Sequence, residues 1–127
     1  MRYLLDTHAI LWCAQGDDSL PDSVRTIMRD EECSYSIASL WEIAIKQSLN
    51  KLDIGLSLVD LDRQCQMAGF RRMAIDVVHF ERIKTLPDIH RDPFDRMLVA
   101  QAKAENMSFL THDPLIPYYG EKCIIRV

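Results

Sequence analysis

The sequence predicts an α/β fold in which helices flank a central, mostly parallel sheet of four to five strands. Short apolar runs alternate with longer segments of helical periodicity along the chain, which is the pattern of strands joined by crossover helices. Hydrophobic residues make up 48% and charged residues 27% of the 127 residues, as in an ordinary globular protein. We expect one domain over residues 1–127, because this length is typical of a single domain.

Each predicted strand is a short apolar run bounded by polar or turn-forming residues. These runs lie at residues 2–5, 33–37, 73–75, 108–111 and 123–127. Because the strands alternate with helices, the carboxyl ends of parallel strands should meet at one edge of the sheet, where ligand sites form in such folds.

The predicted helices have apolar residues every three or four positions, and most have a recognisable start or stop. They lie at residues 7–15, 22 to about 31, 39 to about 49, 58–68, 77–86 and 93 to about 106. Pro21 and Pro93 suit the beginning of a helix, Ser57 suits an N-cap, and Gly69 suits a left-handed stop. Residues 112–119 are predicted to form a turn or a short helix.

Several classes of protein are excluded. No stretch approaches the roughly 18 apolar residues of a membrane helix. Asp6 and His8 interrupt the apolar N-terminus, so we expect no signal peptide and a cytoplasmic location.

The four cysteines are far apart and form no metal-binding pattern, which predicts reduced thiols in the core. The net charge of −4 argues against a generally basic surface for nucleic acid, unless several acids bind metal.

Carboxylates fall where predicted strands give way to helices. They are Asp6, Glu42, Asp92, Asp95 and Asp113. Each also has a purely structural explanation. Ser39 and Glu42 fit a capping box, Asp92 and Asp95 fit a helix start, Asp6 could be a cap, and Asp113 precedes a proline in a predicted turn.

Taken together, these carboxylates indicate a metal site. Two carboxylates 4 Å apart repel by about 4 kcal/mol at an effective dielectric constant of about 20, so a cluster of four needs compensation. Without Asp6, Glu42, Asp95 and Asp113, the chain has 15 of its 19 acidic residues left, which equals its 15 basic residues. The rest of the chain is therefore neutral. Oxygen ligands suit Mg²⁺ or Mn²⁺, and such sites are common in phosphodiester hydrolysis.

Four segments carry a resemblance to a known family. They are Leu4–His8, Ser39–Lys46, His90–Ala102 and Leu110–Asp113. In order and spacing they resemble PIN-domain proteins, and more narrowly the VapC-type toxins of bacterial toxin–antitoxin pairs. The resemblance implies a three-layer sandwich and a metal-dependent endoribonuclease that hydrolyses RNA with an activated water. It also implies a homodimer and a cognate antitoxin protein that blocks the acidic groove.

The resemblance also assigns roles to individual residues. The catalytic and metal-binding residues would be Asp6, Glu42, Asp95 and Asp113, which hold Mg²⁺ or Mn²⁺. Thr111 and Asp92 would support these ligands. Arg96, Arg91 and Lys46 are candidates for contacting the RNA backbone, although a solvated charge or a local ion pair explains each slightly better. We place His8, His90 and His112 outside the chemistry, and we expect Trp12 and Phe94 to pack in the core.

Two other functions stay open from the sequence. One is a PIN-like module that binds without catalysis, which a missing acid would favour. The other is a receiver-like switch that forms an aspartyl phosphate, for which Asp76 is the candidate. A haloacid-dehalogenase-type phosphatase would need a second aspartate two residues after the first, and His8 occupies that position.

Overall fold

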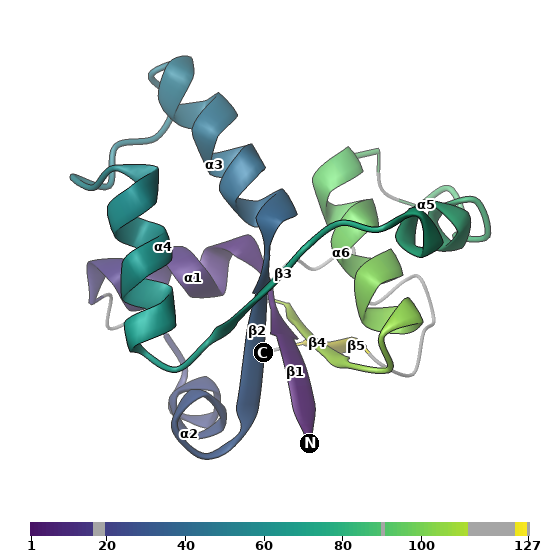
Figure 1. The fold of residues 1–127 in the computed structure, drawn as a ribbon, viewed down its shortest axis with the longest axis horizontal. Coiled ribbons are helices and arrows are strands. Elements are labelled where there is room, and N and C mark those ends of the chain that lie inside the picture. Colours follow the sequence, from purple (N-terminus) through teal and green to yellow (C-terminus); the bar gives the residue numbers. More distant parts are fainter. Residues whose placement is uncertain (17–19, 90, 112–123, 127) are drawn as a thin grey trace.

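Five parallel strands form one sheet at the centre of the structure (Figure 1). The structure is a computed structural model, and it describes residues 1–16, 20–89, 91–111 and 124–126. The strand order is β3-β2-β1-β4-β5, and the four described pairings are all parallel. The strands are β1 Arg2–Leu5, β2 Glu32–Ser36, β3 Arg71–Met73, β4 Ser108–Thr111 and β5 Ile124–Arg126.

Helices cover both faces of this sheet, which confirms the predicted three-layer α/β fold (Figure 1). The helices are α1 Thr7–Gln15, α2 Asp22–Asp30, α3 Ile37–Ser48, α4 Leu58–Met67, α5 Val77–Ile83 and α6 Pro93–Ala104. Within the described residues, no helix is both long enough and apolar enough to span a membrane.

Two apolar cores lie on opposite faces of the sheet because side chains alternate along a strand. Leu5 of β1 packs in one core with Ile10 and Leu61, from α1 and α4. Its neighbour Leu4 packs in the other core with Leu98 of α6. Leu4, Leu5 and Leu98 are fully buried. Burying both faces of β1 explains why its sequence is a continuous apolar run.

The predicted bounds of β1, α1 and β4 are confirmed, and three other elements begin earlier than predicted: β2 by one residue, and α3 and β3 by two residues each. The helix predicted from residue 39 begins at Ile37, since the Ser36 hydroxyl accepts a hydrogen bond from Ala38 N at 3.0 Å and caps it. Strand β3 begins two residues early, at Arg71, because an exposed edge strand does not need apolar residues. Residues 112–119 lie outside the described part of the chain.

The cysteines only partly follow the prediction. Cys33 and Cys65 are buried free thiols, and burial raises the pKa of each to about 11. They are therefore protonated and unreactive at neutral pH. The prediction is wrong for Cys13, which is exposed because it lies on the outer side of the apolar stripe of α1. Cys123 lies outside the described residues.

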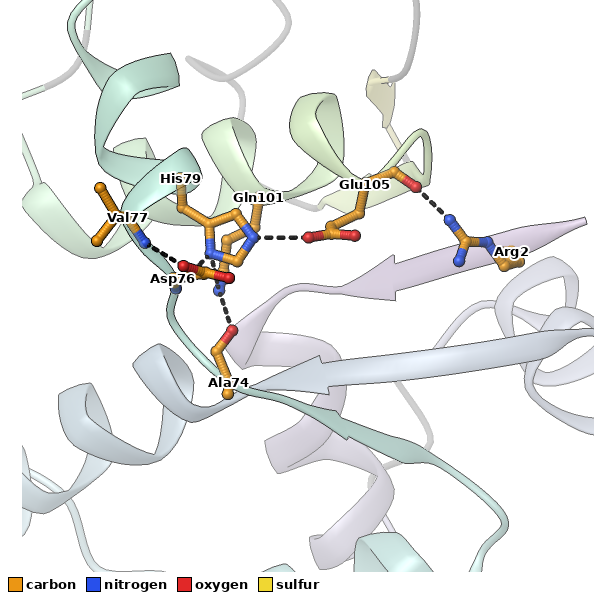
Figure 2. A network of polar contacts seen from close by, with 7 residues as sticks. All are labelled: Arg2, Ala74, Asp76, Val77, His79, Gln101 and Glu105. Carbon is orange, nitrogen blue, oxygen red and sulfur yellow. Dashed lines mark hydrogen bonds and ion pairs between the residues drawn. The ribbon is translucent and has the colours of Figure 1, made fainter.

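A buried histidine ties α5 to α6 (Figure 2). His79 is only 1% exposed. Its Nδ1 accepts a hydrogen bond from Asp76 N at 3.0 Å, and its Nε2 lies 2.9 Å from Glu105 Oε1. A backbone N–H can only donate, so Nδ1 is the acceptor and Nε2–H donates to the carboxylate. The Asp76 carboxylate accepts from Val77 N at 2.6 Å and so caps α5.

The arrangement around His79 predicts a large loss of stability for His79→Ala. The substitution leaves a cavity and removes the partner of the Asp76 N–H, so we expect the free energy of unfolding to fall by about 2–4 kcal/mol. Urea denaturation measures this quantity. Val78→Ala is the matched control, because Val78 is exposed on the same helix and should change it by less than about 0.5 kcal/mol. A loss below about 1 kcal/mol for His79→Ala would contradict the assigned role.

Candidate active site

A cavity of about 420 Å³ opens at the carboxyl-terminal edge of the sheet. Four separate segments supply its walls: the start of α1, the middle of α3, the connection between α3 and α4, and the start of α6. Its carboxylates are Asp6, Glu42, Asp92 and Asp95. The fold therefore brings together four of the five acids that the sequence singles out. The fifth, Asp113, lies outside the described residues. The predicted placement at strand-to-helix transitions is wrong for Asp92 and Asp95, because α6 follows α5 and not a strand.

Asp6 joins the sheet to α1. Its backbone N donates to Leu110 O at 3.1 Å, which continues the pairing of β1 with β4. Its Oδ1 accepts from Ala9 N at 2.8 Å and caps the helix, so the structural explanation of Asp6 is correct. The side chain also lines the cavity. The cap therefore fixes the orientation of a carboxylate that is only 6% exposed.

Glu42 is held by side chains and not by a capping box. Its Oε1 accepts a hydrogen bond from Thr7 Oγ1 at 2.9 Å, and its Oε2 accepts from Lys46 Nζ at 2.9 Å. The predicted capping box with Ser39 is wrong, because α3 begins at Ile37 and places Glu42 in its second turn. At 7% exposure, an ionised Glu42 needs such partners to offset its lost hydration.

The start of α6 carries the remaining described acids. Asp92 is its N-cap, with Oδ1 accepting from Phe94 N at 2.8 Å and from Asp95 N at 3.2 Å. Asp95 lies in the first turn, where the helix dipole favours a negative charge. Both residues line the cavity. Asp92 is therefore a helix cap, as one of its two explanations predicts, and it is also part of the cavity wall.

The residues around the cavity fit a divalent metal in their chemistry, although the described ones form no complete cage. Carboxylate oxygens are the ligands that Mg²⁺ and Mn²⁺ prefer. Within the described residues, however, no three His, Cys, Asp or Glu side chains lie close enough together to hold one ion. The described part of the site thus offers carboxylates around a shared space rather than a tight cluster.

Of the three cations predicted to contact RNA, only Lys46 lines the cavity. Arg96 donates to Pro87 O at 2.9 Å and to Ile83 O at 3.3 Å, so its guanidinium holds the connection between α5 and α6. Arg91 is exposed. Lys51 also lines the cavity, and sequence reasoning missed it. No local pattern identifies Lys51, because the fold of the α3–α4 connection places it there.

The buried hydroxyl groups of Thr7 and Ser39 lie next to Glu42. Thr7 Oγ1 also lies 3.0 Å from Ser39 Oγ, and both residues are buried. Sequence reasoning gave neither residue a role at the site, although Thr7 directly follows Asp6 in a motif that carries the family resemblance. Thr111 is fully buried at the end of β4, the strand that pairs with β1.

The prediction that Trp12 and Phe94 pack in the core is wrong, because both are half-buried. The Trp12 ring stacks on His8, with centroids 6.0 Å apart and planes 19° apart. The Phe94 ring meets Trp41 edge to face, with centroids 5.1 Å apart. Helical spacing places each of Trp12 and Phe94 on the apolar stripe of its own helix, α1 or α6, but each stripe runs past the edge of the core.

The family model described as PIN domain matches residues 3–121. Among solved structures, the chain is similar to VapBC2 from Rickettsia felis, solved with a DNA fragment from its promoter. The TM-score is 0.68 at 14% identity, covering 100% of this chain and 98% of that one. A toxin–antitoxin complex from Klebsiella pneumoniae has a TM-score of 0.58 at 14% identity, covering 97% and 95%. No curated protein matches the sequence.

These structural likenesses support the fold, and the family model covers nearly the whole sequence. The chain belongs to the PIN-domain family.

Proposed function

We propose that this protein is a Mg²⁺- or Mn²⁺-dependent endoribonuclease and the toxin of a toxin–antitoxin pair. The observation that carries the proposal is the convergence of Asp6, Glu42 and Asp95 on one cavity from three separate segments of a PIN-domain chain. Caps and surface carboxylates have no reason to share a cavity, whereas a phosphodiesterase needs this convergence.

The proposed metal ligands are Asp6, Glu42, Asp95 and Asp113, with Asp92 and Thr111 supporting them. A bound divalent cation would lower the pKa of an attacking water and offset the charge of the phosphate. The chain itself contributes orientation. Ala9 N fixes the Asp6 carboxylate, and Thr7 and Lys46 fix that of Glu42, so little reorganisation is needed when RNA arrives.

The toxin part of the proposal draws on the structural neighbours. Both similar structures are toxin–antitoxin complexes by their descriptions, and each is covered over nearly its full length. We infer a cognate antitoxin that covers the acidic cavity, a homodimeric state and action on RNA in the cytoplasm. A partner that blocks carboxylates would have to carry cations, since an apolar partner would leave them buried and unpaired.

Lys46 has a second role in this proposal, as an internal counter-ion. Four carboxylates line the cavity, and the Lys46 ammonium already pairs with one that is buried, Glu42. A divalent cation and Lys46 therefore compensate the same negative charge. Removing the lysine should destabilise the metal-free protein and should increase the stabilisation that metal provides.

The substitution Asp6→Asn tests the nuclease. Asparagine is a good N-cap, so α1 should keep its start while the site loses a charged ligand. We expect cleavage of a mixed-sequence RNA in Mg²⁺ or Mn²⁺ to fall by about 100-fold or more, and EDTA to abolish it in the unmodified protein. The RNA must be incubated with protein freed of antitoxin.

Asp76→Asn is the matched control for this experiment, because Asp76 also caps a helix and lies outside the cavity. It should leave cleavage unchanged. A folded Asp6→Asn variant that cuts RNA as fast as the unmodified protein would contradict the proposal. Metal binding without any cleavage would favour the non-catalytic binding module.

The substitution Lys46→Gln tests the counter-ion. We expect the free energy of unfolding in EDTA to fall by about 1–2 kcal/mol, a discounted value because the lysine side chain is 47% exposed. The stabilisation by Mn²⁺ should grow relative to the unmodified protein, as urea denaturation with and without metal would show.

Lys84→Gln is the control for Lys46, since Lys84 forms an exposed pair with Glu81 and does not line the cavity. Its loss should cost less than about 0.5 kcal/mol. Equal metal stabilisation of the Lys46→Gln variant and the unmodified protein would exclude a counter-ion role.

A further inference from the structure

Besides its acids, the cavity has a wall that suits a nucleotide. His8 and Leu11 of α1 form part of this wall, and Lys51 and Leu52 of the α3–α4 connection form another part. This set combines an aromatic ring, two aliphatic side chains and a cation beside the proposed catalytic carboxylates. The preceding proposal leaves these four residues without a role.

His8 has the geometry of a stacking platform. It is exposed and lines the cavity, while its ring lies nearly parallel to the indole of Trp12, one helical turn further along α1. One face of the imidazole lies toward the indole, and the exposed ring can offer its other face to a second flat ring. Single-stranded nucleic acids are commonly bound by stacking bases on such side chains.

Lys51 supplies the charge that an RNA backbone needs near these acids. The cavity lining carries four carboxylates and two lysines, and Glu42 pairs with one of them, Lys46. Lys51 is exposed and forms no ion pair with any residue that the structure describes. Without such a cation, a phosphate approaching the cavity would meet net repulsion from the acids.

We propose that His8 and Lys51 form a subsite for the nucleotide next to the cleaved phosphodiester, with the base stacked on His8 and its phosphate on Lys51. This inference rests on the proposed ribonuclease function. Trp12 is a positioning residue, because it acts through His8. The subsite requires an unpaired base, since a base within a duplex already stacks on its neighbours.

Binding of short fluorescent RNA, measured by anisotropy in Mg²⁺, tests the subsite. The Asp6→Asn protein serves as the parent, so that cleavage does not interfere. Adding His8→Ala should weaken binding of single-stranded RNA about 5- to 100-fold, and His8→Phe should restore it, because phenylalanine also stacks. Adding Lys51→Gln should reduce the slope of log K against log salt by about 0.7, the value for one phosphate contact.

Controls of matched chemistry come from α5. Phe80→Ala removes an exposed aromatic ring and Lys84→Gln an exposed cation, both outside the cavity, and neither should change binding. Circular dichroism and thermal unfolding show whether each variant is folded. Rescue by His8→Phe also separates stacking from a folding defect.

The outcomes distinguish the subsite from the ribonuclease itself. If the unmodified protein cleaves RNA while both His8→Ala and Lys51→Gln bind single-stranded RNA as the parent does, the subsite is wrong and the nuclease proposal stands. Equal weakening of single-stranded and double-stranded RNA by His8→Ala would also overturn it. If the parent binds no RNA and the unmodified protein cuts none, both proposals fall together.

Discussion

The parallel pairing of β1 with β2 and β4 is the constraint on which the site depends. Parallel strands end at the same edge, so the residues that follow β1 and β2 meet there although more than 30 positions separate them. The hydrogen bond from Asp6 N to Leu110 O extends this register to the first cavity residue. Burial of both faces of β1 makes the register hard to shift, because a slip of one residue would exchange Leu4 and Leu5 between the two cores.

Gathering carboxylates at this edge has an electrostatic cost, and the chain offsets part of it locally. Asp6 lies at the N-terminus of α1, and Asp92 and Asp95 lie at the N-terminus of α6. Glu42 forms an ion pair with Lys46, one helical turn further along α3. Helix N-termini favour negative charge by about 0.3–1 kcal/mol each at exposed positions, which is less than the repulsion between close carboxylates. The remaining imbalance is what a divalent cation would remove. The same groups that cap helices thus also line the cavity, and capping does not argue against a functional role.

Sequence reasoning succeeded where local pattern and final environment agree. The bounds of β1 and β4 follow from apolar runs buried on both faces, and so does the place of Asp6 directly after β1. It failed where two nearby residues both suit the same structural role. Ser36 and Ser39 both suit an N-cap, and the pairing of β2 with β3, which includes Ser36, decides between them. It also missed Lys51, because only the path of the chain after α3 brings that cation to the cavity.

The central claim is that carboxylates from separate segments hold one divalent cation in this cavity. A crystal structure of the antitoxin-free protein with Mn²⁺, using the anomalous scattering of the metal, tests it most directly. The account predicts a peak in the cavity with oxygens of Asp6 and Asp95 about 2 Å away, the distance of a direct oxygen ligand. A crystal saturated with Mn²⁺ that shows no peak in the cavity, or shows one only at acids outside it, would contradict the account.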